Sequence, residues 1–148
     1  MLHLEDITED NWRLGLSVSD EQKDYVSSPM KLLARAYAYR NSGSFACVIY
    51  NGCEPVGMAL YYDCPELDAY IFSQLFIDKR YQGRGYGKAA ARLILDRMKS
   101  EGKFGKAVLC YTKGNDVAKA LYESLGFYHT GKSDGDEIIM ELPLFDIR

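Results

Sequence analysis

The spacing of the hydrophobic positions changes along the chain, and the change separates a helical region from a region of strands. In residues 30–39, the apolar side chains Leu32, Leu33, Ala36 and Tyr37 recur at helical spacing, as in a helix that buries one face. Thr8 is a suitable N-cap for a helix through Leu16, and a second helical stretch follows over residues 19–26. Pro29 suits the first turn of a further stretch that ends near residue 39. We therefore expect a short strand at residues 2–4, followed by helices.

From residue 44 the pattern changes to that of strands, and residues 68–78 are apolar almost throughout, which is typical of a strand covered on both faces. The predicted strands are residues 44–50, 54–63, 68–78, 106–112, 127–132 and 136–142. Asn51-Gly52 between the first two is a strong hairpin signal, and helices are predicted up to about Glu101 and from Asn115 to Gly126. The strand–helix–strand unit in the middle should be parallel and right-handed. The fold class is therefore α/β, with a mixed central sheet and helices on both faces.

Length and charge add limits to this prediction. With 148 residues, the chain suits one domain over residues 1–148, which can bury about 70% of its unfolded surface. A net charge of −3 without a basic stripe argues against nucleic acid as the main partner. The N-terminus lacks the pattern of a secretory signal, and no apolar run approaches the roughly 20 residues of a membrane span. We expect a soluble cytoplasmic protein with neither a membrane nor a nucleic-acid partner.

The cysteines and histidines do not form a metal-binding pattern. The four cysteines make no CxxC pair, and the two histidines are not spaced with them as zinc ligands. Cys47 and Cys110 lie in apolar runs, where cysteine usually packs as a small hydrophobe. Reduced thiols and no metal are the expectation.

Three glycines alternate with side chains in "YQGRGYGKAA" (81–90), directly before a predicted helix. A dinucleotide-binding GxGxxG fails because its third glycine would fall on Lys88. A P-loop fails because Lys88 is followed by Ala89, and no glycine stands five residues before Gly87. Bare backbone leading into a first helical turn still favours an anion such as a pyrophosphate, with Arg84 and Lys88 beside it.

The spacing Gln82-x-x-Gly85-x-Gly87 resembles the acetyl-CoA-binding motif of the GNAT N-acetyltransferase superfamily. The stretch "NDVAKALYESLGF" (115–127) is similar to a later block of that family, and the order of elements matches the family domain from end to end. The stretches "VSDEQKDYV", "LARAYAY" and "LFIDKRYQGRGYGKAA" most resemble bacterial spermine/spermidine acetyltransferases. The resemblance implies the GNAT acyl-CoA N-acyltransferase fold over the whole chain, with acetyl-CoA as co-substrate.

The resemblance also implies where the donor binds. Two parallel strands, 70–77 and 106–111, should splay apart near a bulge, so that the pantetheine arm lies along the exposed edge of the first strand. A main-chain N–H there is the expected oxyanion donor. The implied CoA-binding residues are Leu75, Phe76 and Ile77, then Gln82, Gly83, Arg84, Gly85, Tyr86, Gly87 and Lys88, then Asn115, Ala118 and Lys119.

Tyr122 stands where the family places the tyrosine that protonates the CoA thiolate. An unperturbed phenol has a pKa of about 10, close enough to that of a thiol to serve as donor. Some polyamine acetylators are thought to use a glutamate on the third central strand as base, but the matching positions here are Ser73 and Gln74. The base stays open between water and a carboxylate elsewhere, the candidates being Glu137, Asp63 and Glu66.

A polyamine would be held by carboxylates and aromatic faces. The candidate acceptor-binding residues are Glu21, Asp24, Tyr37, Asp63 and Glu66. We expect acetyl transfer to a primary amine, with spermidine or spermine as substrate, by direct attack in a ternary complex. The alternatives are a GNAT acting on a protein N-terminus, an amino acid or an aminoglycoside, and a non-catalytic CoA-binding sensor. A homodimer is expected from the resemblance alone.

Overall fold

The computed structural model describes residues 1–145, in which one mixed sheet has the strand order β1-β2-β3-β4-β5-β7-β6. Its strands are β1 (Leu2–Asp6), β2 (Phe45–Asn51), β3 (Glu54–Cys64), β4 (Ala69–Ile77), β5 (Lys106–Thr112), β6 (Tyr128–Asp134) and β7 (Glu137–Pro143). The helices are α1 (Pro29–Ala38), α2 (Tyr86–Glu101) and α3 (Asp116–Ser124), with 3-10 turns η1 (Asp20–Gln22), η2 (Arg40–Ser42), η3 (Pro65–Leu67) and η4 (Lys79–Tyr81).

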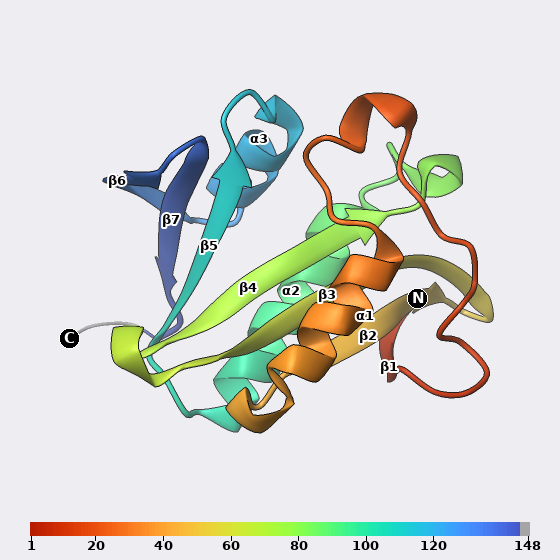
Figure 1. Cartoon of the computed structure of the whole chain (residues 1–148), viewed down its shortest axis with the longest axis horizontal. Helices are drawn as coiled ribbons and strands as arrows, with labels where there is room; N and C mark the ends of the chain where they lie inside the picture. Colours follow the sequence, from red (N-terminus) through yellow and green to blue (C-terminus); the bar gives the residue numbers. More distant parts are fainter. Residues whose placement is uncertain (146–148) are drawn as a thin grey trace.

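The parallel pair β4 and β5 separates soon after it forms. The two strands are paired only at Tyr70 with Ala107 and at Ile71 with Val108, whereas the other neighbouring strands pair antiparallel. Beyond this point they diverge, and Figure 1 shows the opening between them with α3 beside it. A bulge at Ser73 lies where the divergence begins, because Phe72 pairs with β3 on one side of it and Gln74 on the other. The predicted mixed sheet with a splayed parallel pair is therefore confirmed.

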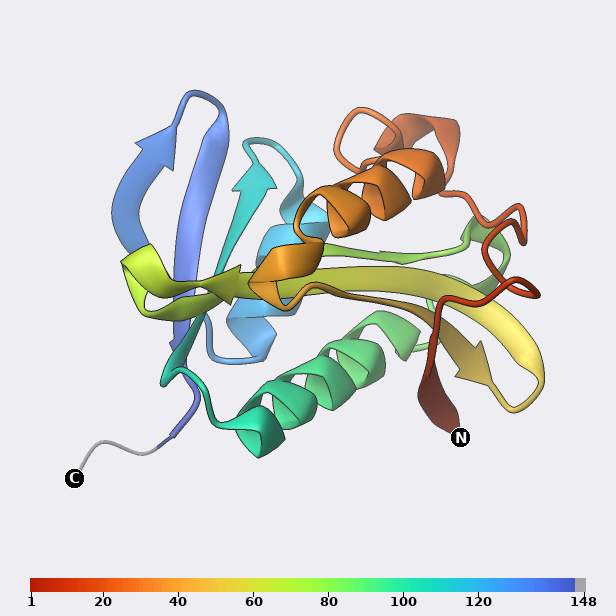
Figure 2. The same cartoon turned by 60° about the horizontal axis from the view of Figure 1, so that its bottom comes forward.

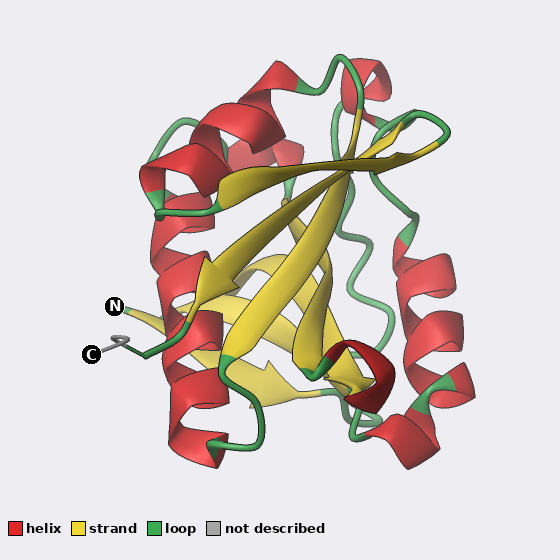
Figure 3. Cartoon of the chain, turned by 90° about the vertical axis from the view of Figure 1, so that its left-hand side faces the viewer, coloured by secondary structure: helices red, strands yellow, loops and turns green. Residues whose placement is uncertain are grey.

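Helices cover both faces of the sheet, as Figures 2 and 3 show, with α1 on one side and α2 on the other. Neighbouring residues of the central strands point to opposite faces: Ile49 packs in the core under α2, whereas Val48 packs in the core under α1 with Leu32. This double coverage explains why the central strands read as continuous apolar runs. Within residues 1–145, no helix is both long and apolar enough to cross a membrane.

The predicted helix over residues 8–16 is wrong, because local side-chain bonds replace the helical ladder. The side chain of Asn11 accepts a hydrogen bond from the Thr8 N–H, 2.7 Å, and donates to the Asp6 carbonyl, 2.9 Å. Gly15 has a φ of +70°, which interrupts a helix, and Leu16 then packs under α1 as part of an extended segment.

The helix predicted over residues 19–26 is also wrong, since only the turn η1 forms there. Its charged residues leave no apolar stripe that could fasten a helix to the sheet, and none of the residues of η1 is buried. From α1 onward, the predicted helices and strands are confirmed to within a few residues at their ends.

Candidate active site

A segment that we call the strap, residues 17–28, crosses the end of β4 and is fastened there by Asp78. The buried carboxylate of Asp78 accepts hydrogen bonds from the Ser17 N–H, 2.9 Å, and from Nε of Arg80, 2.8 Å. The Lys79 N–H donates back to the Ser17 carbonyl, 2.9 Å. Burial by itself would raise the pKa of Asp78, but the hydrogen bonds from Arg80 and Ser17 bring that pKa below its usual value. Asp78 therefore ties the strap to the beginning of the glycine loop.

A cavity of 390 Å³ lies between the strap, the end of β4, the start of α2 and α3. The predicted CoA-binding residues that line it are Leu75, Phe76, Ile77, Gln82, Gly83, Gly85, Tyr86, Gly87, Lys88, Asn115 and Ala118. We call it the donor cavity. Residues from three separate parts of the sequence therefore meet at one surface, as the resemblance implied.

The glycine loop presents bare backbone at the start of α2. Gly83 and Gly85 have φ values of +79° and +81°, which are accessible to glycine with little strain, and Gly85 is the N-cap of the helix. The N–H groups of the first turn have no partner inside the helix, and the helix dipole makes this end favourable for an anion. The loop and the helix terminus together can accept a phosphate group.

The end of β4 offers main-chain groups on its open side. The Asp78 N–H donates to the Val56 carbonyl on β3, 2.7 Å, whereas the Ile77 carbonyl accepts from the side chain of Gln82, 2.8 Å. Because alternate residues of a strand direct their main-chain groups to opposite sides, Leu75 shares the open side with Ile77. This edge can pair with an extended amide-containing ligand.

Of the other residues predicted to bind CoA, some line the donor cavity and some do not. The Gln82 side chain bonds to the Ile77 carbonyl and to Oε1 of Gln22 on the strap, 2.8 Å, so it joins the loop to the strap. Asn115 caps α3 by accepting from the Ala118 N–H, 3.3 Å. Arg84, which lies over the Tyr81 ring, and Lys119 are exposed and do not line the donor cavity.

Tyr122 differs from the other buried tyrosines in the state of its hydroxyl group. Its ring packs edge-to-face against Phe72 and Phe127, with centroids 6.0 and 5.6 Å away. The hydroxyls of Tyr61, Tyr70 and Tyr111 bond to protein groups, but that of Tyr122 makes no hydrogen bond within the described residues 1–145. Because no fully buried polar side-chain atom among these residues lacks a partner, the Tyr122 hydroxyl is open to the cavity. Burial raises the pKa of Tyr122, so the phenol keeps its proton throughout the neutral pH range but is a weaker acid than the unperturbed phenol considered from the sequence. The arrangement leaves a protonated hydroxyl at the cavity.

A second cavity, of 520 Å³, lies between α1, the strap and the open face of β4, β5 and β7. We call it the acceptor cavity. Five residues line both cavities: Val26, Leu75, Asn115, Ala118 and Tyr122. The two spaces therefore meet beside Leu75 and Tyr122, at the opening between β4 and β5.

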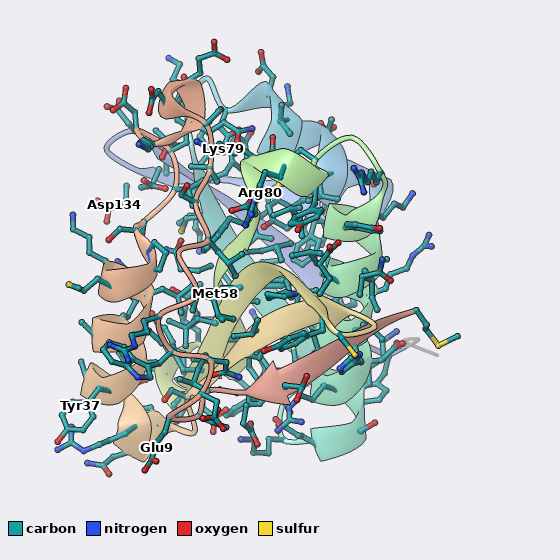
Figure 4. All side chains as sticks on the ribbon, turned by 90° about the vertical axis from the view of Figure 1, so that its right-hand side faces the viewer. Glu9, Tyr37, Met58, Lys79, Arg80 and Asp134 are labelled. Carbon is teal, nitrogen blue, oxygen red and sulfur yellow. The ribbon has the colours of Figure 1, made fainter. Side chains whose placement is uncertain are left out.

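The predicted acceptor residues are not brought together. Asp24 lines the acceptor cavity, and Glu21 lies exposed nearby on η1. Tyr37 lines neither cavity, and Figure 4 shows its side chain at the opposite end of the molecule from the labelled Arg80. Asp63 lies at the C-terminal end of β3, where it forms an ion pair with Lys103, 2.8 Å, and Glu66 lies in the turn η3 that follows. Asp63 and Glu66 are therefore separate from the acceptor cavity.

Sequence reasoning missed the cations of the acceptor cavity. Lys23, Lys31 and Arg35 line it, and Arg35 donates from Nη1 to the hydroxyl of Ser73 at the bulge, 3.2 Å. The helical repeat placed Arg35 on α1, but only the packing of α1 against β2 and β3 shows which space it faces. Cys110 is exposed here, contrary to the packing expected from its apolar run, because β4 diverges from β5 and leaves it uncovered.

Comparison with known proteins agrees with this geometry. Residues 4–127 match the sequence profile of the Acetyltransferase (GNAT) family. The spermine/spermidine N(1)-acetyltransferase of Bacillus subtilis (strain 168) is 29% identical over 153 aligned residues, covering 95% of this chain and 97% of that protein. This confirms the resemblance found in the sequence.

Solved structures share the fold over nearly the whole chain. The spermidine N-acetyltransferase of Vibrio cholerae, in complex with CoA and spermine, superposes with a TM-score of 0.78 at 18% identity, covering 97% of this chain and 95% of that one. The ribosomal-protein-S18-alanine N-acetyltransferase of Escherichia coli gives 0.72 at 20% identity, covering 100% and 97%. The chain belongs to the GNAT acetyltransferase family, and it is an N-acetyltransferase that uses acetyl-CoA.

Proposed function

We propose that the protein transfers the acetyl group of acetyl-CoA to a primary amine by direct attack within a ternary complex. The observation that carries this proposal is the junction of the two cavities beside Leu75 and Tyr122. A thioester placed at the junction from one side is within reach of an amine arriving from the other. Direct attack then needs no acyl-enzyme intermediate.

The donor cavity suits CoA in two places. The glycine loop and the first turn of α2 would hold the pyrophosphate, since they combine unpaired N–H groups with the positive end of a helix dipole. The pantetheine arm would pair with the open edge of β4, and an N–H near Leu75 would stabilise the oxyanion. Tyr122 would then protonate the departing thiolate, because its hydroxyl is protonated and has no protein hydrogen-bond partner within residues 1–145.

Polyamines are the acceptor class that we propose first. The B. subtilis relative that matches 95% of this chain is a spermine/spermidine acetyltransferase, and the acceptor cavity contains two carboxylates, Asp24 and Glu137. Tyr25 and Tyr62 line the same cavity and offer aromatic faces to an alkylammonium chain. The homodimer, the single-domain organisation and the cytoplasmic location expected from the sequence stay predictions.

Arg35 favours a second acceptor class, an amine that also carries an anionic group. Its guanidinium reaches the floor of the acceptor cavity, where its side-chain bond is to the neutral hydroxyl of Ser73, and no carboxylate within residues 1–145 lies within 4.0 Å of it. A half-buried guanidinium in this state is suited to a carboxylate or phosphate. Amino acids are the simplest members of this class.

A panel of amines assayed with acetyl-CoA tests these alternatives. It should contain spermidine, spermine, simple alkylamines, amino acids, an aminoglycoside and peptides with free N-termini. Because Cys53 and Cys110 are exposed, a thiol reagent would also label the enzyme, so the acetylated product should be measured by mass spectrometry. Higher kcat/KM for spermidine and spermine than for the other amines supports the polyamine assignment. Higher kcat/KM for amino acids supports the second class, and CoA binding without any acetylated product would indicate a sensor.

A further inference from the structure

Glu137, the first residue of β7, lies across the strand opening from the place where the thioester is expected. Ile71 is paired with Val108, and counting along both strands past the bulge brings Leu75 and Phe76 level with Tyr111 and Thr112. Thr112 is in turn the ladder partner of Glu137. Strand register therefore sets Glu137 at the same height as the junction of the two cavities.

The side chain of Glu137 faces the acceptor cavity and remains available. It is half-buried, lines that cavity, and accepts one hydrogen bond at Oε1 from Thr112 Oγ1, 3.1 Å. No lysine or arginine within the described part of the chain lies within 4.0 Å of it, whereas Asp63 and Glu141 form ion pairs with Lys103 and Lys106. One oxygen of the Glu137 carboxylate is therefore held by a hydrogen bond from a neutral hydroxyl group, and the other makes no hydrogen bond within the described residues.

The charged surroundings of Glu137 come from several elements. The cations that line the cavity are Lys23 on the strap and Lys31 and Arg35 on α1. The acidic groups nearby are Asp24 on the strap and Asp134 on β6, while burial raises the pKa of the neighbouring Cys110 thiol and keeps it neutral. The tyrosines that line the cavity are Tyr25, Tyr62, Tyr111 and Tyr122. The only other carboxylate that lines the cavity among the described residues, Asp24, is exposed on the strap and is not fixed to the sheet.

We propose that Glu137 is the general base of the reaction, an inference that rests on the proposed acetyl transfer to an amine. The carboxylate takes one proton from the acceptor's ammonium group, directly or through one water, and releases it to solvent. The nitrogen lone pair then forms the C–N bond at the thioester carbonyl, and the C–S bond breaks. The thiolate takes the proton of Tyr122, which recovers one from the attacking nitrogen. One proton is released overall, as the conversion of an ammonium ion into an amide requires.

The test is the pH dependence of kcat/KM for Glu137→Gln, with the best amine from the panel. Without the base, only the fraction of amine that is already neutral reacts. At neutral pH the variant should therefore lose about 10²- to 10⁴-fold in kcat/KM. This loss should shrink about tenfold for each pH unit toward the pKa of the amine, because the neutral fraction rises by that factor. With a fluorinated amine that is neutral at pH 7, the variant should be nearly as active as the parent.

Two further variants separate a base from a structural or binding role. Glu141→Gln, on the same strand, removes a carboxylate outside the acceptor cavity and should keep the parent's pH profile. Glu137→Asp keeps the carboxylate but withdraws it by one methylene, so it should keep the parent's profile at a lower rate, and it serves if the glutamine variant does not fold. CoA affinity should be the same in all of these proteins.

The proposal is overturned if the loss in Glu137→Gln is independent of pH and equal for neutral and cationic amines. It is equally overturned if the variant matches the parent at neutral pH. Either result leaves the acetyl transfer itself standing, because the parent is active in the same assay. A parent that acetylates no amine would instead contradict the proposed function.

Discussion

Replacing Tyr122 with Phe should remove the acid and leave the fold and the donor site intact. The substitution keeps the ring contacts with Phe72 and Phe127 and breaks no protein hydrogen bond within residues 1–145, so the free energy of unfolding should change by less than about 0.5 kcal/mol. Loss of a positioned acid should lower kcat about 10²- to 10⁴-fold, which corresponds to roughly 3–5 kcal/mol in the activation free energy. The Kd for CoA should stay within about twofold, since no charge or main-chain group is altered.

Tyr70→Phe is the matched control, because it removes a tyrosine hydroxyl that is hydrogen-bonded within the protein and lines neither cavity. That hydroxyl donates to the Met98 carbonyl and accepts from the Lys103 N–H, both at 3.0 Å, in the core under α2. Its loss should cost about 1–3 kcal/mol in stability and leave kcat unchanged. The assays are urea unfolding, calorimetric titration with CoA and steady-state kinetics on both variants. Unchanged kcat in Tyr122→Phe, or a large loss of CoA affinity, would refute the assignment of Tyr122 as the acid.

Three further predictions test the supports of the site. Because the pKa of Asp78 is lowered in the folded state, its carboxylate stabilises the fold above the unfolded pKa of about 4, and this contribution is lost as pH falls through the folded pKa. The free energy of unfolding, measured with urea, should therefore fall less steeply with decreasing pH in Asp78→Asn than in the parent. Gly57→Ala should destabilise the protein by about 1–3 kcal/mol and weaken CoA binding, because the added Cβ would clash with the main chain of β4 near its open end. The control Gly105→Ala adds a Cβ that meets open space, so it should leave the temperature of thermal unfolding unchanged. Asp24→Asn should raise KM for spermidine, whereas Asp63→Asn should leave KM unchanged and cost about 1 kcal/mol or less in stability. The reverse pattern would restore Asp63 and Glu66 as acceptor-binding residues.

The gathering of the predicted CoA-binding residues at one cavity was largely predictable from sequence, because it depends on local signals. Alternating glycines before a helix and an asparagine N-cap act through nearby main-chain groups, and the structure brings Gly85 and Asn115 to one cavity. Apolar runs and turn signals likewise predicted the succession of strands and helices along the chain from residue 44 onward. These features need little knowledge of tertiary packing.

The acceptor side was not predictable in the same way, because it depends on how separate elements cross. In the sequence, Asp24 and Asp63 cannot be distinguished, because both are predicted to be acidic surface residues. In the structure only Asp24 lines the acceptor cavity, whereas Asp63 pairs with Lys103, which follows the end of α2. Arg35 had no signal beyond its place in a helical repeat. The failed helix over residues 8–16 has a related cause, since Asn11 satisfies nearby main-chain groups that a helix would have used.

The open edge of β4 has a consequence for how such an enzyme can change its substrate. In the proposed mode of binding, the donor meets main-chain groups there, which persist whatever side chain a residue carries, while the acceptor meets the side chains of the strap and α1. Substitutions over residues 23–35 can therefore alter acceptor choice while the donor's contacts remain. A library built to redirect the acetyl group to new amines should vary that segment and leave β4 and the glycine loop untouched.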